Sequence, residues 1–467
     1  MLFNTIQFWV FFLAVWAAVR YLRTQQQLTV LLGASLIFYG LWVPVYLLLL
    51  LFTIGLNFVL LQAMLSSDQP RRWLATSIVA TLGMLGYFKY GEFFVESVAP
   101  LVELASGRTL AIPDILLPLG ISFYSFQIIA VSVDTYRGQL QPIRSFSRYA
   151  LFVCFFPQLI AGPIVRGADL LPQLERGPIS TPQRTRRGAW LIASGLAKKV
   201  LFADFLLAHF VATAFNRAPE ATAPILLVAA YSFSFQIYFD FSGYTDIARG
   251  LALLLGFELP FNFKEPYLSR TPSEFWRRWH ITLSTWLRDY LYIPLGGNRH
   301  GRGRTAINLM ITMLLGGLWH GASWTFVVWG GLHGLLLVVQ RPFTRRQADV
   351  TDSISALDVL RIVVLFHLVC LLWVFFRADS FDAASVFIAR IAGGDFAAEW
   401  PMFQVLVVVL CAALHPLERV ARLRSREWQA IVANSRWGPL AEGVAAGILA
   451  ALCVAASSGG EFIYFQF

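Results

Sequence analysis

Charged residues are scarce in this sequence. Asp, Glu, Lys and Arg make up 14% of the 467 residues, whereas 57% are apolar. Because soluble proteins carry about 25% charged residues, this composition excludes an ordinary soluble globular protein. Several apolar stretches come near or exceed about 18 residues, the length that is typical of a membrane span. The composition therefore predicts a polytopic membrane protein.

Cysteine is also scarce. The four cysteines lie far apart in apolar segments, at Cys154, Cys370, Cys411 and Cys453. This spacing argues against a disulfide framework and against a zinc site. No HExxH or other compact metal-ligand spacing occurs, so we expect no bound metal or cofactor.

The glycine-rich run LGGNRHGRGR lacks the Gly-Lys-Ser/Thr ending of a P-loop and is interpreted as a solvated basic turn, which could still attract an anionic phosphate.

Basic residues outnumber acidic ones, which gives a net charge of +10. The basic runs are short and interrupted by apolar segments, and no nucleic-acid-binding module is present, so we expect no nucleic-acid partner. Lys and Arg instead concentrate in alternate loops, while intervening loops carry acids such as Glu92, Glu96 and Asp382. Under the positive-inside rule, this bias places the N-terminus outside the cytoplasm.

Apolar periodicity predicts an all-α chain with about 11–12 transmembrane helices. The first apolar segment lacks the marks of a cleaved signal peptide, so we expect it to remain as a helix. Prolines and a glycine in 149–166 predict a broken or re-entrant segment. The expected helices are about 3–20, 28–42, 45–65, 73–90, 114–134, 188–215, 224–256, 306–320, 323–340, 358–376, 402–417 and 438–456.

We expect these helices to form one membrane domain over residues 1–467. Its parts are N-terminal helices at 1–135, a central core at 136–340 and C-terminal helices at 341–467. The longest piece that is not expected to span is 257–305, on the cytoplasmic side.

The stretch TPSEFWRRWHITLSTWLRDYLY, within that piece, is predicted to begin an amphipathic helix. Thr271 suits the N-cap, Pro272 the first helical position, and Glu274 completes a capping box. Apolar residues then recur every three or four positions, with the basic residues off the stripe. From composition alone, a plain anchor at the membrane interface is favoured. The stripe consists of Trp276, Trp279, Leu283, Trp286, Leu287 and Tyr290.

Histidines in apolar surroundings are candidates for chemistry. His320, in LLGGLWHGASW, lies beside Trp319 and among glycines that let another backbone or a substrate come close. An ionisable residue inside a membrane is a functional hypothesis by default, although helix packing is the alternative. His280 follows Trp279 and, taken alone, is more often structural. His333, in WGGLHG, is expected to share the environment of His320. The other histidines are expected to be peripheral or to lie in the basic turn: His209, His300, His367 and His415.

The apolar stretch YSFSFQIYFDFSGYTDIARG contains two acids, Asp240 and Asp246, with Tyr244 between them. Buried acids need partners. Both structural ion pairs and substrate contact remain open as explanations. The expected partners are Arg249, Arg277 and Arg278.

Several long motifs occur in order, and they cover nearly the whole chain. They are FFPQLIAGPIVR, FDFSGYTDIARGLALLLGF, PYLSRTPSEFWRRWHITLSTWLRDYLYIPLGGNR, LLGGLWHGASWTFVVWGGLHG and FIYFQF. Together they resemble the membrane-bound O-acyltransferase family, most closely its bacterial branch that acetylates polysaccharides such as alginate. The D-alanyl transfer proteins of teichoic acid synthesis are more distant.

The resemblance implies a ring of tilted helices, thin at its centre, with funnels from both faces. It also implies a functional pair of polar residues about 40 positions apart, which matches His280 and His320. His320 is then the expected general base, and His280 is expected to hold or polarise the acyl donor. Many eukaryotic members have asparagine where this chain has His280.

The resemblance further implies acyl transfer, with acetyl as the expected group and acetyl-CoA as the donor. Arg277, Arg278 and Lys264 are expected to attract the phosphates of acetyl-CoA. Further expected contacts to substrate or donor are Asp240, Tyr244, Asp246, Trp276, Trp319 and His333.

The expected setting is the bacterial inner membrane, with a periplasmic N-terminus. The expected partners are a periplasmic or membrane-anchored acetyltransferase and an exported polysaccharide. Alginate, cellulose and peptidoglycan all remain open as acceptors. A transporter or export channel without chemistry, and a scaffold for a periplasmic enzyme, are the alternatives to an enzyme.

Overall fold

The computed structural model is helical, and its described residues contain no β-strand, which confirms the all-α prediction. The chain divides into two compact units: unit 1 is Met1–Ile192 with Ile247–Pro260, and unit 2 is Ala193–Asp246 with Phe261–Phe467. The single domain over 1–467 stays a prediction. The structure describes residues 3, 5–107, 109–160, 162–341, 355–423, 438–456 and 463.

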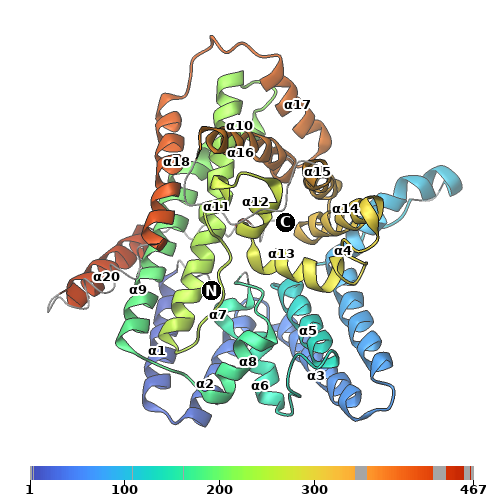
Figure 1. Ribbon diagram of the computed structural model, residues 1–467, viewed down its shortest axis with the longest axis vertical. Helices are drawn as coiled ribbons and strands as arrows, with labels where there is room; N and C mark the ends of the chain where they lie inside the picture. Colours follow the sequence, from blue (N-terminus) through green and yellow to red (C-terminus); the bar gives the residue numbers. More distant parts are fainter. Residues whose placement is uncertain are drawn as a thin grey trace. The chain divides into compact units, whose positions relative to one another are not determined.

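Helix ends in unit 1 follow local signals. The Thr5 side chain caps α1, while Pro44 and Pro70 lie in the first turns of α3 and α4, where a missing N–H costs little. The predicted end of α4 near residue 90 is wrong, because the helix continues until the left-handed Gly107 stops it. The helices, drawn in Figure 1, are α1 (Ile6–Tyr21), α2 (Thr24–Gly40), α3 (Pro44–Ser66), α4 (Pro70–Ser106), α5 (Ile121–Tyr136), α6 (Phe146–Cys154), α7 (Phe156–Leu159) and α8 (Gly167–Arg176).

The helix within 149–166 is interrupted, as predicted. α6 ends at Cys154, and α7 lasts only four residues beyond Phe155. The backbone N–H of Phe156 donates to the Ser35 hydroxyl of α2 at 3.2 Å, so a side chain supplies a partner where helical hydrogen bonding is interrupted.

Unit 2 holds most of the later elements. The predicted helix over 188–215 changes type along its length, because a π-helical stretch separates two α-helices. α9 (Pro182–Leu196) and α11 (Ala223–Leu254) have residues in both units. The other elements are η1 (Ala197–Ala208), α10 (His209–Asn216), η2 (Pro266–Leu268), α12 (Pro272–Arg278), α13 (Ile281–Leu287), η3 (Arg288–Tyr292), α14 (Gly301–His320), α15 (Trp324–Gln340), α16 (Ala356–Arg377), α17 (Phe381–Ala392), α18 (Met402–Leu423) and α20 (Gly438–Ala456).

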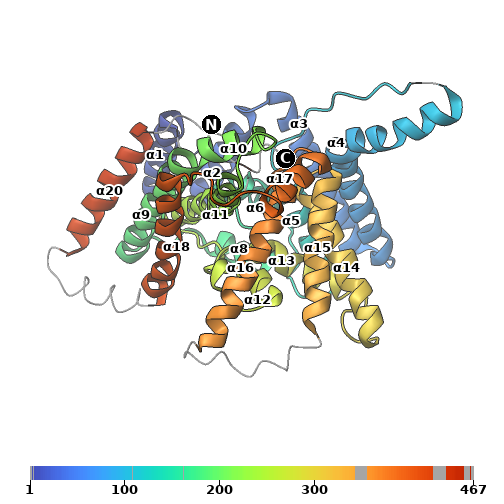
Figure 2. The same ribbon diagram turned by 90° about the horizontal axis from the view of Figure 1, so that it is seen from above.

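α14 and α15 pack side by side through glycines (Figure 2). A Cβ on Gly317 would lie 2.2 Å from the Phe326 carbonyl oxygen, and one on Gly330 would lie 2.2 Å from the Met313 carbonyl oxygen. Small residues let helix backbones approach closely in membranes. The sequence left open whether these glycines let another backbone or a substrate come close. At Gly317, the geometry supports the close approach of the α15 backbone.

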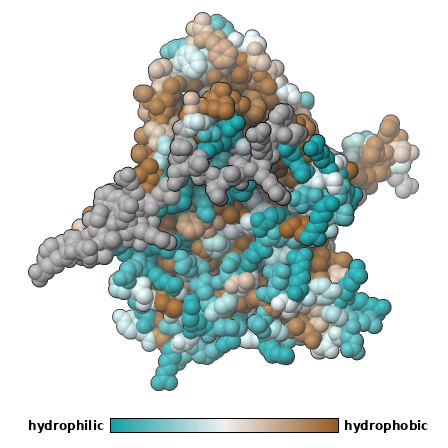
Figure 3. Space-filling view, viewed as in Figure 1, coloured by the Kyte–Doolittle hydropathy of each residue, from teal (hydrophilic) through white to brown (hydrophobic). Residues whose placement is uncertain are grey.

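Four described helices are long and apolar enough to cross a membrane, judged by length and composition: Pro44–Ser66, Ala223–Leu254, Ala356–Arg377 and Met402–Arg422. Shorter apolar helices are Ile6–Tyr21, Trp324–Gln340 and Leu440–Ala451. These helices support a polytopic membrane protein, while the count of about 11–12 spans stays a prediction. α16 exposes apolar side chains, including Leu360 and Val364, and hydrophobic residues gather over its part of the surface in Figure 3.

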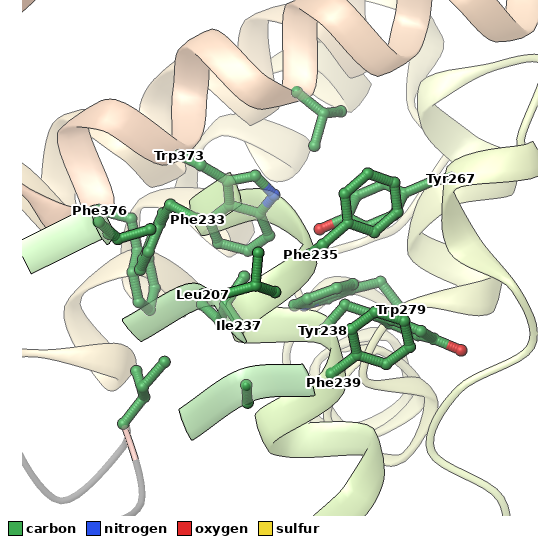
Figure 4. Close-up of a cluster of buried hydrophobic side chains, with 14 of the residues drawn as sticks. Leu207, Phe233, Phe235, Ile237, Tyr238, Phe239, Tyr267, Trp279, Trp373 and Phe376 are labelled. Carbon is green, nitrogen blue, oxygen red and sulfur yellow. The ribbon is translucent and has the colours of Figure 1, made fainter. Parts of the chain in front are cut away.

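The core of unit 2 is aromatic. Trp279, Trp373 and Phe376 are buried in it together with Tyr238 and Tyr267 (Figure 4). The ring centroids of Trp279 and Trp373 are 4.9 Å apart. Large rings packed in this way hold neighbouring side chains in fixed positions.

Candidate active site

The stretch predicted as one amphipathic helix contains two helices. Its start is confirmed, because the Thr271 hydroxyl accepts a hydrogen bond from the Glu274 N–H at 3.2 Å. α12 then ends, and His280 adopts a left-handed backbone with φ 40° and ψ 56° before α13 begins. One continuous interfacial helix is therefore wrong. The apolar spacing persists across the break because Trp279 and Leu283 are both buried inside unit 2.

The fold brings the two predicted catalytic histidines together. The ring centroids of His280 and His320 are 6.1 Å apart. Neither is open to solvent, since His280 is 0% exposed and His320 is 3% exposed. The Trp319 ring lies beside both, at 5.6 Å from His280 and 5.1 Å from His320. Both histidines thus lie in one buried aromatic environment.

His320 is the last residue of α14. Its ring meets the edges of Trp329, at 5.1 Å, and Phe376, at 5.5 Å. The carbonyl end of a helix stabilises a positive charge. An imidazole in this position is therefore well placed to hold a proton that it accepts.

His280 has a different electrostatic setting. It packs edge-on against Phe241 at 4.7 Å, and burial lowers its pKa to about 3. A histidine with this pKa is neutral near pH 7, and a neutral imidazole keeps one N–H donor and one acceptor nitrogen. His280 is thus suited to donate or accept a hydrogen bond without carrying charge.

His333 shares the environment of His320, as predicted. The Trp329 ring lies 4.8 Å from His333 and 5.1 Å from His320, so it contacts both. Trp276 lies 5.0 Å from His333 on another side. Among the described residues, no three His, Cys, Asp or Glu side chains are grouped as metal ligands.

Asp240 and Asp246 belong to a network of ion pairs. Lys199 Nζ lies 2.5 Å from Asp240 and 2.9 Å from Asp204, and Lys198 Nζ lies 2.9 Å from Asp246. Lys198 also pairs with Glu418 of α18 at 2.8 Å, and the Ile463 N–H donates to Asp240 at 2.9 Å. This geometry supports the structural explanation for the two acids, and it adds Lys198 and Lys199 as partners that the sequence did not predict.

The remaining predicted contacts are divided between buried and exposed positions. Tyr244 is buried on α11, one turn beyond Asp240. Arg278 pairs with Glu274 at 2.6 Å, and burial lowers the pKa of its guanidinium despite that carboxylate. Lys264 and Arg277 are exposed. Of the three predicted phosphate contacts, Lys264 and Arg277 therefore present a cation at the surface.

Sequence reasoning missed several residues around the site. His415 is buried rather than peripheral, and its Nε2 accepts a hydrogen bond from the Tyr267 N–H at 3.2 Å. Lys198 and Lys199 could have been recognised from the sequence, because two charges inside a predicted span need partners. The sequence pointed less strongly to Trp329, whose only indication is that it precedes His333 by one helical turn.

These features define a class of protein. The protein is a helical, multi-pass membrane protein whose second unit holds a buried histidine pair in an aromatic frame. The chain matches the family described as MBOAT, membrane-bound O-acyltransferase, over residues 114–376. The chain belongs to this family and is an O-acyltransferase.

Relatives of known name agree with this assignment. The probable alginate O-acetylase AlgI of Azotobacter vinelandii is 40% identical over 402 residues, 85% of this chain and 79% of the relative. The peptidoglycan O-acetyltransferase of Helicobacter pylori is 39% identical over 382 residues, 75% and 71% of the two chains. The teichoic acid D-alanyltransferase of Bacillus subtilis is 27% identical over 280 residues, 56% and 69%.

Proposed function

We propose that this protein acetylates an exported polysaccharide from within the bacterial inner membrane, with its N-terminus in the periplasm. Acetyl-CoA on the cytoplasmic side is the donor. The observation that carries the proposal is the buried pair of His280 and His320, with ring centroids 6.1 Å apart. The similarity to relatives named for O-acetylation of alginate and of peptidoglycan supports the choice of acetyl and of a polysaccharide.

In this mechanism, His320 is the general base. It takes the proton of an acceptor hydroxyl as that oxygen attacks the thioester carbonyl. The C–O bond forms, the C–S bond breaks, and the departing thiolate receives the proton from the imidazolium. A positioned base contributes about 10²–10⁴ to the rate. The position of His320 at the carbonyl end of α14 supports this role.

His280 polarises the donor. Because burial lowers its pKa to about 3, its ring is neutral and can offer an N–H to the thioester carbonyl oxygen. A donor that is held in place stabilises the negative charge that develops on that oxygen. His320, at the end of α14, thus accepts the proton, and His280, at the start of α13, stabilises the developing charge.

The donor approaches from the side of α12. Lys264 and Arg277 are exposed there, and cations of this kind attract the phosphates of acetyl-CoA. Arg278 stabilises α12 through its pair with Glu274, four residues earlier on the same helix. The reacting groups are surrounded by the rings of Trp276, Trp319 and His333. The acceptor hydroxyl belongs to a periplasmic or membrane-anchored acetyltransferase, which then delivers the acetyl group to the polysaccharide.

The proposal is tested with purified protein in proteoliposomes that contain labelled acetyl-CoA on one side. An enzyme releases free CoA when the acceptor and partner are present. The control is His367→Ala, which alters an exposed histidine of α16 and should release CoA at the normal rate. Movement of acetyl or saccharide with no loss of thioester would instead support a transporter.

The acceptor is identified in the native host. We expect deletion of the gene to remove acetyl groups from one polymer, and the wild-type gene to restore them. Acetyl content is measured in alginate, cellulose and peptidoglycan fractions. Unchanged acetylation in every fraction would contradict the proposed function.

A further inference from the structure

The backbone at His280 is strained. His280 and Glu265 are the two non-glycine residues with positive φ among the described residues. A left-handed conformation is unfavourable for a residue with a Cβ and persists only where surrounding contacts impose it. Something must therefore hold His280 in this state, and the hydrogen bonds around it show what does.

The segment before η2 runs alongside the break. The Lys264 N–H donates to the Arg278 carbonyl at 3.0 Å, and the Ile281 N–H donates to the Asn262 carbonyl at 2.9 Å. These two bonds flank His280 on both sides. The far end of the segment is itself fixed, because Glu265 forms two bonds with the Arg422 guanidinium, at 2.9 and 2.7 Å.

Asn262 also uses its side chain. Its Oδ1 accepts from the Thr282 N–H at 3.2 Å and from the Thr282 hydroxyl at 2.8 Å. His280 occupies the N-cap position of α13 but provides no side-chain cap of its own. Asn262, which lies far from α13 in sequence, thus supplies the acceptor that an N-cap residue normally provides. It is 2% exposed, so water does not replace it.

We propose that Asn262 is a positioning residue for His280, which fixes the left-handed backbone and hence the direction of the imidazole. This role rests on the proposed part of His280 in acetyl transfer. Asn262 acts through its acceptors: its carbonyl oxygen binds Ile281 and its Oδ1 binds Thr282, while its Nδ2 meets no described partner. The oxygen of the side chain is therefore the group whose loss matters.

A double-mutant cycle tests this role. Asn262→Ala, His280→Ala and the double variant are compared for kcat and for KM of acetyl-CoA. A misplaced reacting group costs up to about 100-fold in rate, so we expect Asn262→Ala to lower kcat by roughly 10- to 100-fold with little change in KM. The double variant should lose no more than His280→Ala alone, because Asn262 acts through His280.

Rescue separates positioning from general stability. Asn262→Asp keeps an oxygen at the position of Oδ1, so we expect it to retain much of the kcat that Asn262→Ala loses. The matched control is Asn57→Ala in unit 1. Asn57 is also buried, and its Oδ1 accepts from the hydroxyls of Ser77 and Thr81. This control should lower the melting temperature but leave the kcat of the folded protein within about twofold.

The outcomes are distinct. The positioning role alone would be overturned if the double variant lost the product of the two single losses in kcat. It would also be overturned if Asn262→Asp had a normal melting temperature but a kcat as low as that of Asn262→Ala. Full activity of His280→Ala would overturn both this role and the proposed function of His280.

Discussion

Two groups of buried and half-buried polar side chains in unit 2 are built in opposite ways. Around Lys198 and Lys199, charged groups pair directly, with nitrogen–oxygen distances of 2.5–2.9 Å. Around His280 and His320, the neighbours are aromatic rings, at centroid distances of 4.7–6.1 Å. The first group joins η1, α11 and α18. The second lies where a helix breaks and another ends.

The difference separates architecture from chemistry. A buried charge is stable only when it is paired, and such pairs fix the helices that carry them. A histidine packed among aromatic rings is held in a fixed position, and a strained backbone beside it is a common feature of functional sites. We therefore propose that the lysine network serves folding and the histidine pair serves catalysis, and the following predictions test that division.

The largest effect is expected from Lys199→Met. Asp240 is 1% exposed and would lose its cation, and breaking a buried ion pair typically costs about 3–5 kcal/mol. The folded yield in detergent should collapse, as measured by size-exclusion chromatography and thermal melting. Any folded remainder should retain its kcat. A well-folded but inactive Lys199→Met variant would move this network into the catalytic machinery.

The next effect is expected from His280→Asn. Asparagine tolerates the left-handed backbone, so α12 and α13 should keep their arrangement while the imidazole is lost. We expect kcat to fall by about 100-fold, the size of effect seen when a donor to a developing oxyanion is removed. The melting temperature at neutral pH should stay close to that of the wild type. An active His280→Asn variant would show that an amide replaces the imidazole here.

A smaller effect is expected from pH. The pKa of His280 is about 3 in the folded protein and about 6.5 when unfolded, so the unfolded chain takes up a proton first as pH falls. The stability contributed by neutral His280 is present above pH ~6.5 and is lost as the pH falls towards the folded pKa. This amounts to at most about 2 kcal/mol by pH ~5. The melting temperature of the wild type should therefore fall below that of His280→Asn on acidification, and curves that stay parallel would contradict the assigned environment.

Much of the fold could be predicted because its signals are local. Apolar periodicity located α2, α3, α15 and α16 within a few residues, and the cap at Thr271 follows from a short motif. The pairing of His280 with His320 came from the family resemblance, since no local rule joins residues 40 positions apart.

The rest depends on contacts that are distant in sequence. The break at His280 is imposed by Asn262 and Lys264, while the apolar spacing itself continues across it. The partner of Lys198 on α18 is Glu418, 220 positions away. Periodicity describes one helix at a time, so it cannot reveal bonds of this kind.

The central claim is that His320 accepts the proton during acetyl transfer. The direct measurement is the single-turnover rate of acetyl transfer from acetyl-CoA to the acceptor by His320→Ala, with His367→Ala as the control histidine variant. We predict a loss of about 10²–10⁴ for His320→Ala at a normal melting temperature, and none for His367→Ala. A His320→Ala protein that transfers acetyl at the wild-type rate would contradict the account.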